Sequence, residues 1–256
     1  MVDSGNQISS GYVDFYNVYK SLVDTALARP AQAEIQAYWW RTGNRAQFYA
    51  RVENLSSVTL SSSNSATVHA IVYEDAHIME TDRFARAAVA TGISNLAPNA
   101  SATFTLETSD LVDVNWEKLH FIVLVDYRPS GATGNYDTLQ AAIAQPVAGP
   151  FVALPETVTF LVDPNDLSMP TASITLIGPA SETWLAVPNA PWLTVTPTSG
   201  LISTQPTISV IKSQLSTGWQ QGSITFANSE GDLSDQVFVN TYLGPISRLY
   251  LPIAGR

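Results

Sequence analysis

The apolar positions of this chain follow two different periods, and the change from one to the other falls near residue 30. In residues 12–28, apolar side chains recur three and four positions apart, which is the spacing of one face of an α-helix. From Ala33 onward, short runs rich in β-branched and aromatic residues are separated by turn residues, as in β-strands. Arg29-Pro30 lies between the two patterns, and the residue before a proline avoids helical conformation. The pattern predicts one amphipathic helix followed by an all-β chain.

Seven strands are predicted in residues 33–145. The first two are joined by a hairpin turn at Thr42-Gly43-Asn44. Residues 119–127 are apolar at both parities, so we expect a central strand with both faces covered. Seven strands is the number found in an immunoglobulin-like β-sandwich. The expected strands are residues 34–41, 45–54, 66–75, 83–90, 100–107, 119–128 and 136–144.

Two turns in this region carry a resemblance. V-E-N-L-S at residues 52–56 and L-A-P-N-A-S at residues 96–101 look like the V-x-N-x-G and L-x-P-G-x-S turns of CARDB-type domains. That family consists of immunoglobulin-like modules of bacterial surface proteins. The similarity covers residues 33–145, and it departs from the family at Ser56 and Asn99-Ala100, where glycine is preferred.

The second half is organised around W-L-T-V-T-P-T-S-G at residues 192–200. Pro191 and Pro197 bracket a short apolar strand, since proline is excluded from central strands. Further strands are predicted at residues 222–226 and 237–242. This order resembles the BACON domain, a bacterial all-β module, over residues 156–244. The resemblance implies that Trp192 is buried between two sheets, and that the module binds glycan or mucin or acts as a spacer.

The expected fold is mainly β, with two tandem immunoglobulin-like β-sandwich domains preceded by one amphipathic α-helix. The connection near residues 145–151 contains two prolines and a glycine, which predicts a stiff segment without helix or sheet. Residues 248–253 resemble the C-terminal tails of some secreted bacterial proteins, or form a last edge strand. The expected parts are an N-terminal strand and helix segment at 1–32, a sandwich at 33–145, a Pro-rich linker at 146–155, a BACON-like sandwich at 156–245 and a tail at 246–256.

The apolar stripe of the predicted helix requires a partner surface. One interpretation is that it docks on the sheet face that carries Trp39 or Trp40. The other is that residues 1–28 weakly resemble the closing strand and helix of a thioredoxin-like domain, although the C-x-x-C of that family is absent.

Composition narrows the class of partners. The formal net charge is −10, which argues against nucleic acid and anionic membranes as partners. The absence of cysteine excludes disulfides and thiolate catalysis within the chain. No apolar run reaches about 18 residues, so no membrane span is expected. The oligomeric state stays open.

The chemistry-bearing residues are few. His69, His77 and His120 are the only histidines, and E-D-A-H at residues 74–77 lacks paired-histidine spacing. The acidic turns at residues 163–166 and 230–232 could offer oxygen ligands to calcium, or simply be turns. No nucleophile elbow, phosphate loop or dinucleotide fingerprint occurs. We therefore expect no catalytic residue, metal or cofactor, and no enzyme activity.

Two tryptophans are candidates for stacking on a ligand ring. Trp219 lies in the polar, glycine-flanked stretch S-T-G-W-Q-Q-G, expected to be a loop, where it either stacks on a sugar or folds back over the sandwich. Trp40 follows Trp39, so the two side chains point to opposite faces of a strand. One can fill the core, and we expect the helix to cover the other. Trp184 is expected in the core or at an edge.

The sequence favours a non-catalytic module pair of an exported bacterial protein, secreted or at the cell surface. Its role would be that of a spacer, an adhesion module or a carbohydrate-binding module, with a glycan or another surface protein as partner. Two alternatives remain. The chain could be the C-terminal part of a thioredoxin-like redox protein, or the accessory domains of a secreted hydrolase.

Overall fold

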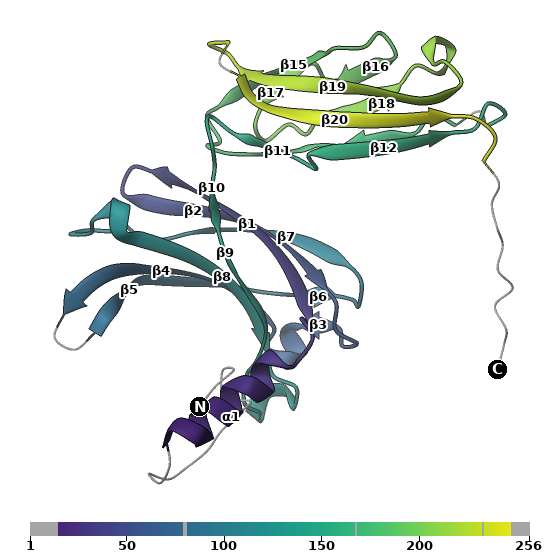
Figure 1. The fold of residues 1–256 in the computed structure, drawn as a ribbon. Coiled ribbons are helices and arrows are strands. Elements are labelled where there is room, and N and C mark those ends of the chain that lie inside the picture. Colours follow the sequence, from purple (N-terminus) through teal and green to yellow (C-terminus); the bar gives the residue numbers. More distant parts are fainter. Residues whose placement is uncertain (1–14, 79–80, 167, 232, 247–256) are drawn as a thin grey trace, which may run out of the picture. The chain divides into compact units, whose positions relative to one another are not determined.

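The computed structural model describes residues 15–78, 81–166, 168–231 and 233–246 (Figure 1). The chain divides into two compact units, Met1–Pro146 and Val147–Arg256. Both are built mainly from β-strands. Among the described residues, no helix is long and apolar enough to cross a membrane. Residues 1–14 of the expected N-terminal strand and helix segment, and the segment at residues 248–253, lie outside the described residues.

Two four-stranded sheets form the first unit. Their orders are β10-β1-β2-β7 and β5-β4-β8-β9, and β3 and β6 form a separate short pair. The inward side chains of both sheets, such as Phe48, Val52, Val68 and Val123, share one buried core. The strands are β1 (Ala33–Thr42), β2 (Arg45–Asn54), β3 (Leu60–Ser61), β4 (Thr67–Ile78), β5 (Thr81–Gly92), β6 (Asn95–Leu96), β7 (Ser101–Glu107), β8 (Leu119–Tyr127), β9 (Asp137–Ile143) and β10 (Gln145–Pro146).

All seven predicted strands of this region are present, with boundaries within a few residues of those expected. The hairpin turn between β1 and β2 is also confirmed. β8 is central in its sheet, as predicted, because it pairs with β4 on one side and β9 on the other. The expectation that both its faces are covered is wrong. His120 is exposed, and Ile122 and Leu124 are only half-buried, since the outer face of this sheet is open to solvent.

The two turn motifs meet at one buried side chain. Asn54 is fully buried at the end of β2. Its amide nitrogen donates to the carbonyl oxygens of Val58 and Leu96, at 2.8 and 2.9 Å. Its Oδ1 accepts from the backbone N–H and the hydroxyl of Ser56. Asn54 therefore gives hydrogen-bond partners to three backbone groups of the two turns, the carbonyls of Val58 and Leu96 and the N–H of Ser56.

A β-bulge interrupts the edge strand β5. Val72 of β4 is opposite Ala87, whereas the next residue, Tyr73, is opposite Ala85, so Arg86 is the extra residue. The Arg86 guanidinium reaches Glu74 on the neighbouring strand at 2.6 Å. The Glu74 carboxylate also accepts a hydrogen bond from the backbone N–H of Asn115.

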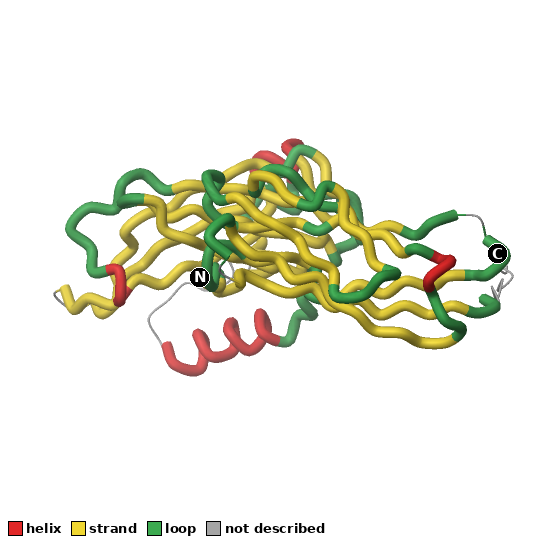
Figure 2. Tube along the Cα trace, turned by 90° about the horizontal axis from the view of Figure 1, so that it is seen from above, coloured by secondary structure: helices red, strands yellow, loops and turns green. Residues whose placement is uncertain are grey.

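The helix α1 (Phe15–Leu27) ends before Arg29-Pro30, as the sequence predicted. Figure 2 shows it as a red coil beside the strands. Its apolar stripe is open to solvent, since Tyr16 is 75% exposed and Leu27 is 78% exposed. The expectation that this stripe docks on a sheet face is therefore wrong. Arg29, just beyond the helix, makes a two-pronged ion pair with Asp137 of β9.

Aromatic rings, not the helix, cover Trp39. The Trp39 ring stacks on Phe121 with centroids 3.6 Å apart, and Trp116 lies on the same stack at 6.5 Å. Trp116 begins a short 3-10 helix, η3 (Trp116–Lys118). The Arg41 guanidinium lies over the Trp116 ring at 4.2 Å. Trp39 thus belongs to the core, and Trp40 points to the opposite face of β1.

The second unit also contains two facing sheets. The larger has the order β12-β20-β19-β15-β17 and the smaller the order β13-β18-β16, with β11 and β14 paired separately. Both sheets direct side chains into one core. The strands are β11 (Val152–Leu154), β12 (Thr157–Val162), β13 (Thr171–Ser173), β14 (Thr175–Ile177), β15 (Thr183–Pro188), β16 (Leu193–Thr196), β17 (Ser199–Leu201), β18 (Thr207–Val210), β19 (Gly218–Asn228) and β20 (Leu233–Leu243).

Trp192 is 6% exposed and lies in this core, which confirms its predicted burial. A Cβ on Gly222 of β19 would come within 3.0 Å of the Trp192 ring and 2.9 Å of Leu193, so glycine allows the strand to pass over the indole. Trp184 is also buried, and its indole N–H donates to the carbonyl oxygen of Leu201.

The segment expected to be a linker takes part in both units. Gln145 and Pro146 form β10, which pairs in parallel with Tyr38 and Trp39 of β1. Phe151 and Ala153 are fully buried in the core of the second unit. The expectation of a connection without sheet therefore does not hold at either end of residues 145–154.

Candidate functional site

The candidate site is an aromatic pair on the outer face of the five-stranded sheet of the second unit. Trp219 of β19 is directly opposite Tyr242 of β20, and Tyr242 is opposite Leu161 of β12. The rings of Trp219 and Tyr242 are 5.3 Å apart and tilted by 51°. They line an open hollow of about 440 Å³ together with Leu161, Pro245 and Ile246. Trp219 is 63% exposed, so most of its ring is free to contact a ligand.

Two glycines set the backbone around this pair. Gly218 begins β19 with a φ of 96°, a value that side-chain-bearing residues rarely adopt. A Cβ on Gly244 would come within 2.6 Å of the Tyr242 hydroxyl oxygen and 2.8 Å of its Cζ. The tyrosine ring therefore occupies the space that a side chain at residue 244 would need.

The neighbouring row of the sheet carries amide and hydroxyl groups. Gln221 of β19 is opposite Asn240 of β20, which is opposite Thr159 of β12. These positions have the same parity as Trp219, Tyr242 and Leu161, so their side chains lie on the same face. The site therefore offers two ring faces beside groups that both donate and accept hydrogen bonds.

The structure corrects one expectation about Trp219. The residue lies in a strand and not in a loop, because β19 pairs with β20 from its first residue, Gly218. The Trp219 side chain is exposed and does not fold back over the sandwich. The sequence signal for this strand is the alternation of inward and outward positions in residues 219–227, which matches that in residues 236–242.

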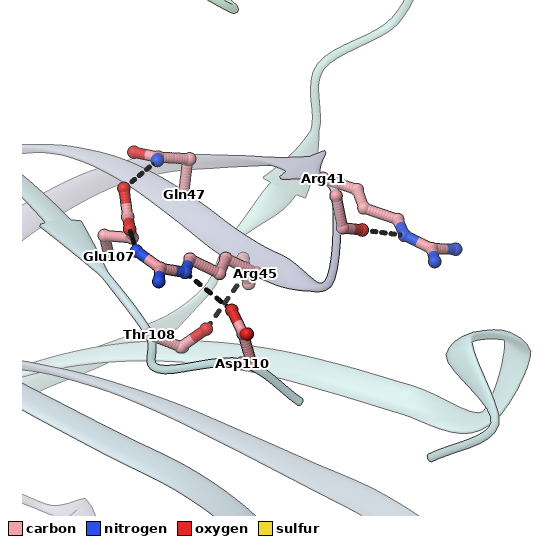
Figure 3. A network of polar contacts seen from close by, with 8 residues as sticks. Arg41, Arg45, Gln47, Glu107, Thr108 and Asp110 are labelled. Carbon is pink, nitrogen blue, oxygen red and sulfur yellow. Dashed lines mark hydrogen bonds and ion pairs between the residues drawn. The ribbon is translucent and has the colours of Figure 1, made fainter. Parts of the chain in front are cut away.

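Trp40, the second candidate, belongs to the other unit and is half-buried. Its row on the outer face of the first unit continues through Gln47 to Glu107. Figure 3 shows Gln47 and Glu107 of this row in a polar network, in which Arg45 bridges Glu107 and Asp110, and Gln47 donates to Glu107. The hydrogen bond from Arg45 holds the pKa of Glu107 below its ordinary value. The surroundings of Trp40 are thus charged and internally paired.

The histidines form separate pairs. Each has an aspartate partner, and the three pairs are His69 with Asp126, His77 with Asp82 and His120 with Asp75. The side chains of residues 74, 75 and 77 therefore turn to different partners. In the described part of the chain, no group of three or more His, Asp or Glu side chains could hold a metal ion.

The acidic turn at residues 163–166 is closed by its own contacts. Asp163 Oδ1 accepts from the backbone N–H of Asn165 at 2.8 Å, a standard turn arrangement. The Lys212 ammonium donates to the carbonyl oxygens of Pro164 and Asp166. A cation from the protein itself thus binds two carbonyl oxygens of this turn. Of the turn at residues 230–232, Asp232 lies outside the described residues.

No family model matches this chain, and no curated protein matches it. Among solved structures, it is similar to red sea bream transglutaminase, with 10% identity over 91% of this chain and 34% of that one, at a TM-score of 0.27. The chain spans about a third of that enzyme. It is also similar to Spo0M, a sporulation control protein from Bacillus subtilis, with 10% identity over 82% and 90% and a TM-score of 0.31. At these values neither likeness bears on function.

Proposed function

We propose that this chain is a pair of non-catalytic, immunoglobulin-like β-sandwich modules of an exported bacterial protein, and that the second module binds a glycan at Trp219. The observation that carries the proposal is the pair of exposed Trp219 and half-buried Tyr242 on two hydrogen-bonded strands. Sites built on strands hold their geometry better than sites built on loops.

The chemistry of a sugar fits this pair. The C–H groups of a pyranose ring carry partial positive charge and lie against the negative face of an indole or phenol ring. The ring hydroxyls need donors and acceptors beside the stack, and Gln221, Asn240 and Thr159 provide both. Neither stacking nor amide hydrogen bonding requires a charged group at the site.

The proposed location outside the cell and the class of partner rest on the sequence resemblances and the composition. The BACON-like motif around Trp192 and the CARDB-like turns around Asn54 support an exported protein, secreted or at the cell surface. The Asn54 network gives a structural reason for an asparagine in the first of these turns. A net charge of −10 makes nucleic acid an unfavourable partner.

The test is a binding measurement with the full chain and a panel of soluble oligosaccharides, by calorimetry and by NMR of the indole N–H signals. Trp219→Ala should weaken the affinity at least about tenfold, a loss of roughly 1.4 kcal/mol. Trp40→Ala is the matched control, since it removes the other candidate tryptophan from the other unit. Equal affinity of wild type and Trp219→Ala would overturn the assignment, and loss on Trp40→Ala would transfer it to the first unit.

The non-catalytic part of the proposal has its own test. The purified chain should show no turnover of esterase, protease, glycosidase or thiol substrates. A turnover that a single substitution abolishes would contradict it.

A further inference from the structure

We infer that the glycan bound at Trp219 is an uncharged polysaccharide that lies flat across the whole outer face of the five-stranded sheet. This inference rests on the proposed function and extends it, because it names the class of ligand and enlarges the site. The face is called the platform below. It consists of the outward positions of β12, β20, β19, β15 and β17.

The platform is a continuous surface of five hydrogen-bonded strands. Its first row is Leu161, Tyr242 and Trp219, on three adjacent strands that span about 10 Å. Phe238 is four residues from Tyr242 on β20, about 13 Å along the strand. Phe238 is exposed, like Trp219. A ligand that contacts both ends is therefore longer than a single sugar ring.

None of the side chains that the described strands direct to the platform is charged. The outward positions of the two longest strands are neutral, with Trp219, Gln221 and Thr225 on β19 and Gln236, Phe238 and Asn240 on β20. β12 contributes Thr157, Thr159 and Leu161. Acidic residues are common elsewhere in this chain, with 22 in all. An anionic ligand would find no cation here to pair with, and a cationic ligand would find no carboxylate.

Apolar side chains continue the platform beyond the aromatic rows. Leu185 and Val187 of β15 and Leu201 of β17 are each about half exposed. Exposed apolar patches of this kind mark interaction surfaces. The burial pattern of β15 alternates, and the opposite positions Trp184 and Ala186 are buried in the core. These three side chains therefore have no role in the core of the unit.

The mixture of groups favours a polysaccharide over a second protein surface. Thr159, Gln221 and Asn240 lie between the aromatic and apolar positions, and a dry protein contact would leave their polar atoms unpaired at a cost of about 1–3 kcal/mol each. A polymer of sugar rings presents C–H faces and hydroxyl groups in alternation. It satisfies the apolar and polar positions of the platform together.

The experiment is depletion of the full chain from solution by insoluble neutral polysaccharides, namely cellulose, chitin, xylan and starch granules. Soluble oligosaccharides and an anionic polymer, polygalacturonate, are measured in parallel, each at low and high salt. At least one neutral solid should deplete the protein, to an extent that salt does not reduce, since no ion pair is involved. Val187→Glu introduces a charge on β15, opposite Thr225 of β19 and six residues along that strand from Trp219, and should weaken depletion at least about tenfold. Thr105→Glu, on the outer face of the first unit, is the matched control.

The outcomes separate the two proposals. Binding of soluble oligosaccharides without depletion by any neutral solid would overturn this inference and leave the proposed function standing. Binding of polygalacturonate that disappears at high salt would also overturn it. If neither soluble nor solid glycans bind, both proposals fail. Concentration-dependent self-association that Val187→Glu abolishes would assign the platform to a second copy of the chain, and would overturn the inference as well.

Discussion

The outer sheet faces of the two units differ in charge. On the first unit, Arg45 bridges Glu107 and Asp110, and Arg51 pairs with Glu53 on the same sheet. The platform of the second unit carries no charge at any outward strand position that the structure describes. Mixed charges on a solvated sheet face favour solubility and oppose unwanted pairing. A neutral, partly apolar face does neither, and it is the face that we propose for the glycan.

Placement, and not only the number of charges, makes this difference. Residues 1–155 contain 9 basic and 15 acidic residues, and residues 156–256 contain 3 and 7. In the second unit, charged residues such as Asp163, Asp166 and Glu230 lie in turns or beside strand ends. The first unit thus exposes a sheet face with paired charges, whereas the second unit exposes a neutral one.

The largest expected change is a loss of stability on truncation of Trp192. It tests whether the second unit depends on its core and not on its platform for stability. Trp192→Ala should lower the free energy of unfolding of that unit by about 3–5 kcal/mol, because it removes a buried indole. Hydrogen exchange followed by mass spectrometry on the full chain should show the loss in residues 156–243 and not in residues 33–143. Trp219→Ala is the control, as the same truncation at an exposed position. Equal losses for the two variants would mean that the platform and the core are not distinct.

Acid should affect the first unit more than the second. The backbone N–H of Asn115 and the Arg86 guanidinium lower the pKa of Glu74 from its ordinary 4.5, and Arg45 lowers that of Glu107. A carboxyl whose folded pKa is lowered contributes stability above its unfolded pKa, and this is lost as the pH falls through the folded value. Exchange protection in residues 33–143 should therefore decline below about pH 4.5. Glu74→Gln should flatten this decline, and an equal decline in the platform strands of wild type would contradict the comparison.

A substitution at Thr241 should change the free energy of unfolding by a smaller amount, and it should raise it. It is fully buried on the core side of β20, and its hydroxyl has no partner among the described residues. Thr241→Val keeps the shape and removes the unpaired group, so it should raise the stability of the second unit by about 1 kcal/mol. Thr225→Val, on the platform side of β19, is the control for β-branched substitution in the same sheet. A fall in melting temperature for Thr241→Val would show that the hydroxyl is paired.

The smallest effect is expected for α1. Because its stripe is exposed, a chain that starts at Arg29 and keeps the ion pair to Asp137 should differ in first-unit stability by less than about 0.5 kcal/mol. Thermal unfolding of the two chains checks this. A drop of several degrees would mean that the helix stabilises the sheets through contacts that its exposure conceals.

The sequence was sufficient for elements whose signal is local. Alternation bounded by turn residues located the strands of the first unit, and the proline-bracketed tryptophan correctly predicted a buried Trp192. Docking of the helix could not be predicted, because amphipathicity shows that one face is apolar and not what covers it. The short strands β3, β6 and β10 were missed because two residues carry no period.

The candidate site was only partly predictable. Trp219 was named as a stacking residue, but its polar, glycine-containing surroundings indicated a loop. Tyr242 was not named, since its role depends on being opposite Trp219 across two strands. The neutrality of the platform depends on register in the same way, because it appears only when alternate residues of five strands are placed side by side.

The bulge at Arg86 has a consequence for the fate of the folded chain at high concentration. β5 is twelve residues long and ends its sheet, so its free backbone groups could template a strand from another molecule. The extra residue breaks the regular sequence of donors and acceptors near the middle of that edge. An incoming strand loses its register there and cannot continue. One inserted arginine, held by Glu74, thus interrupts the regular backbone pattern of this edge strand.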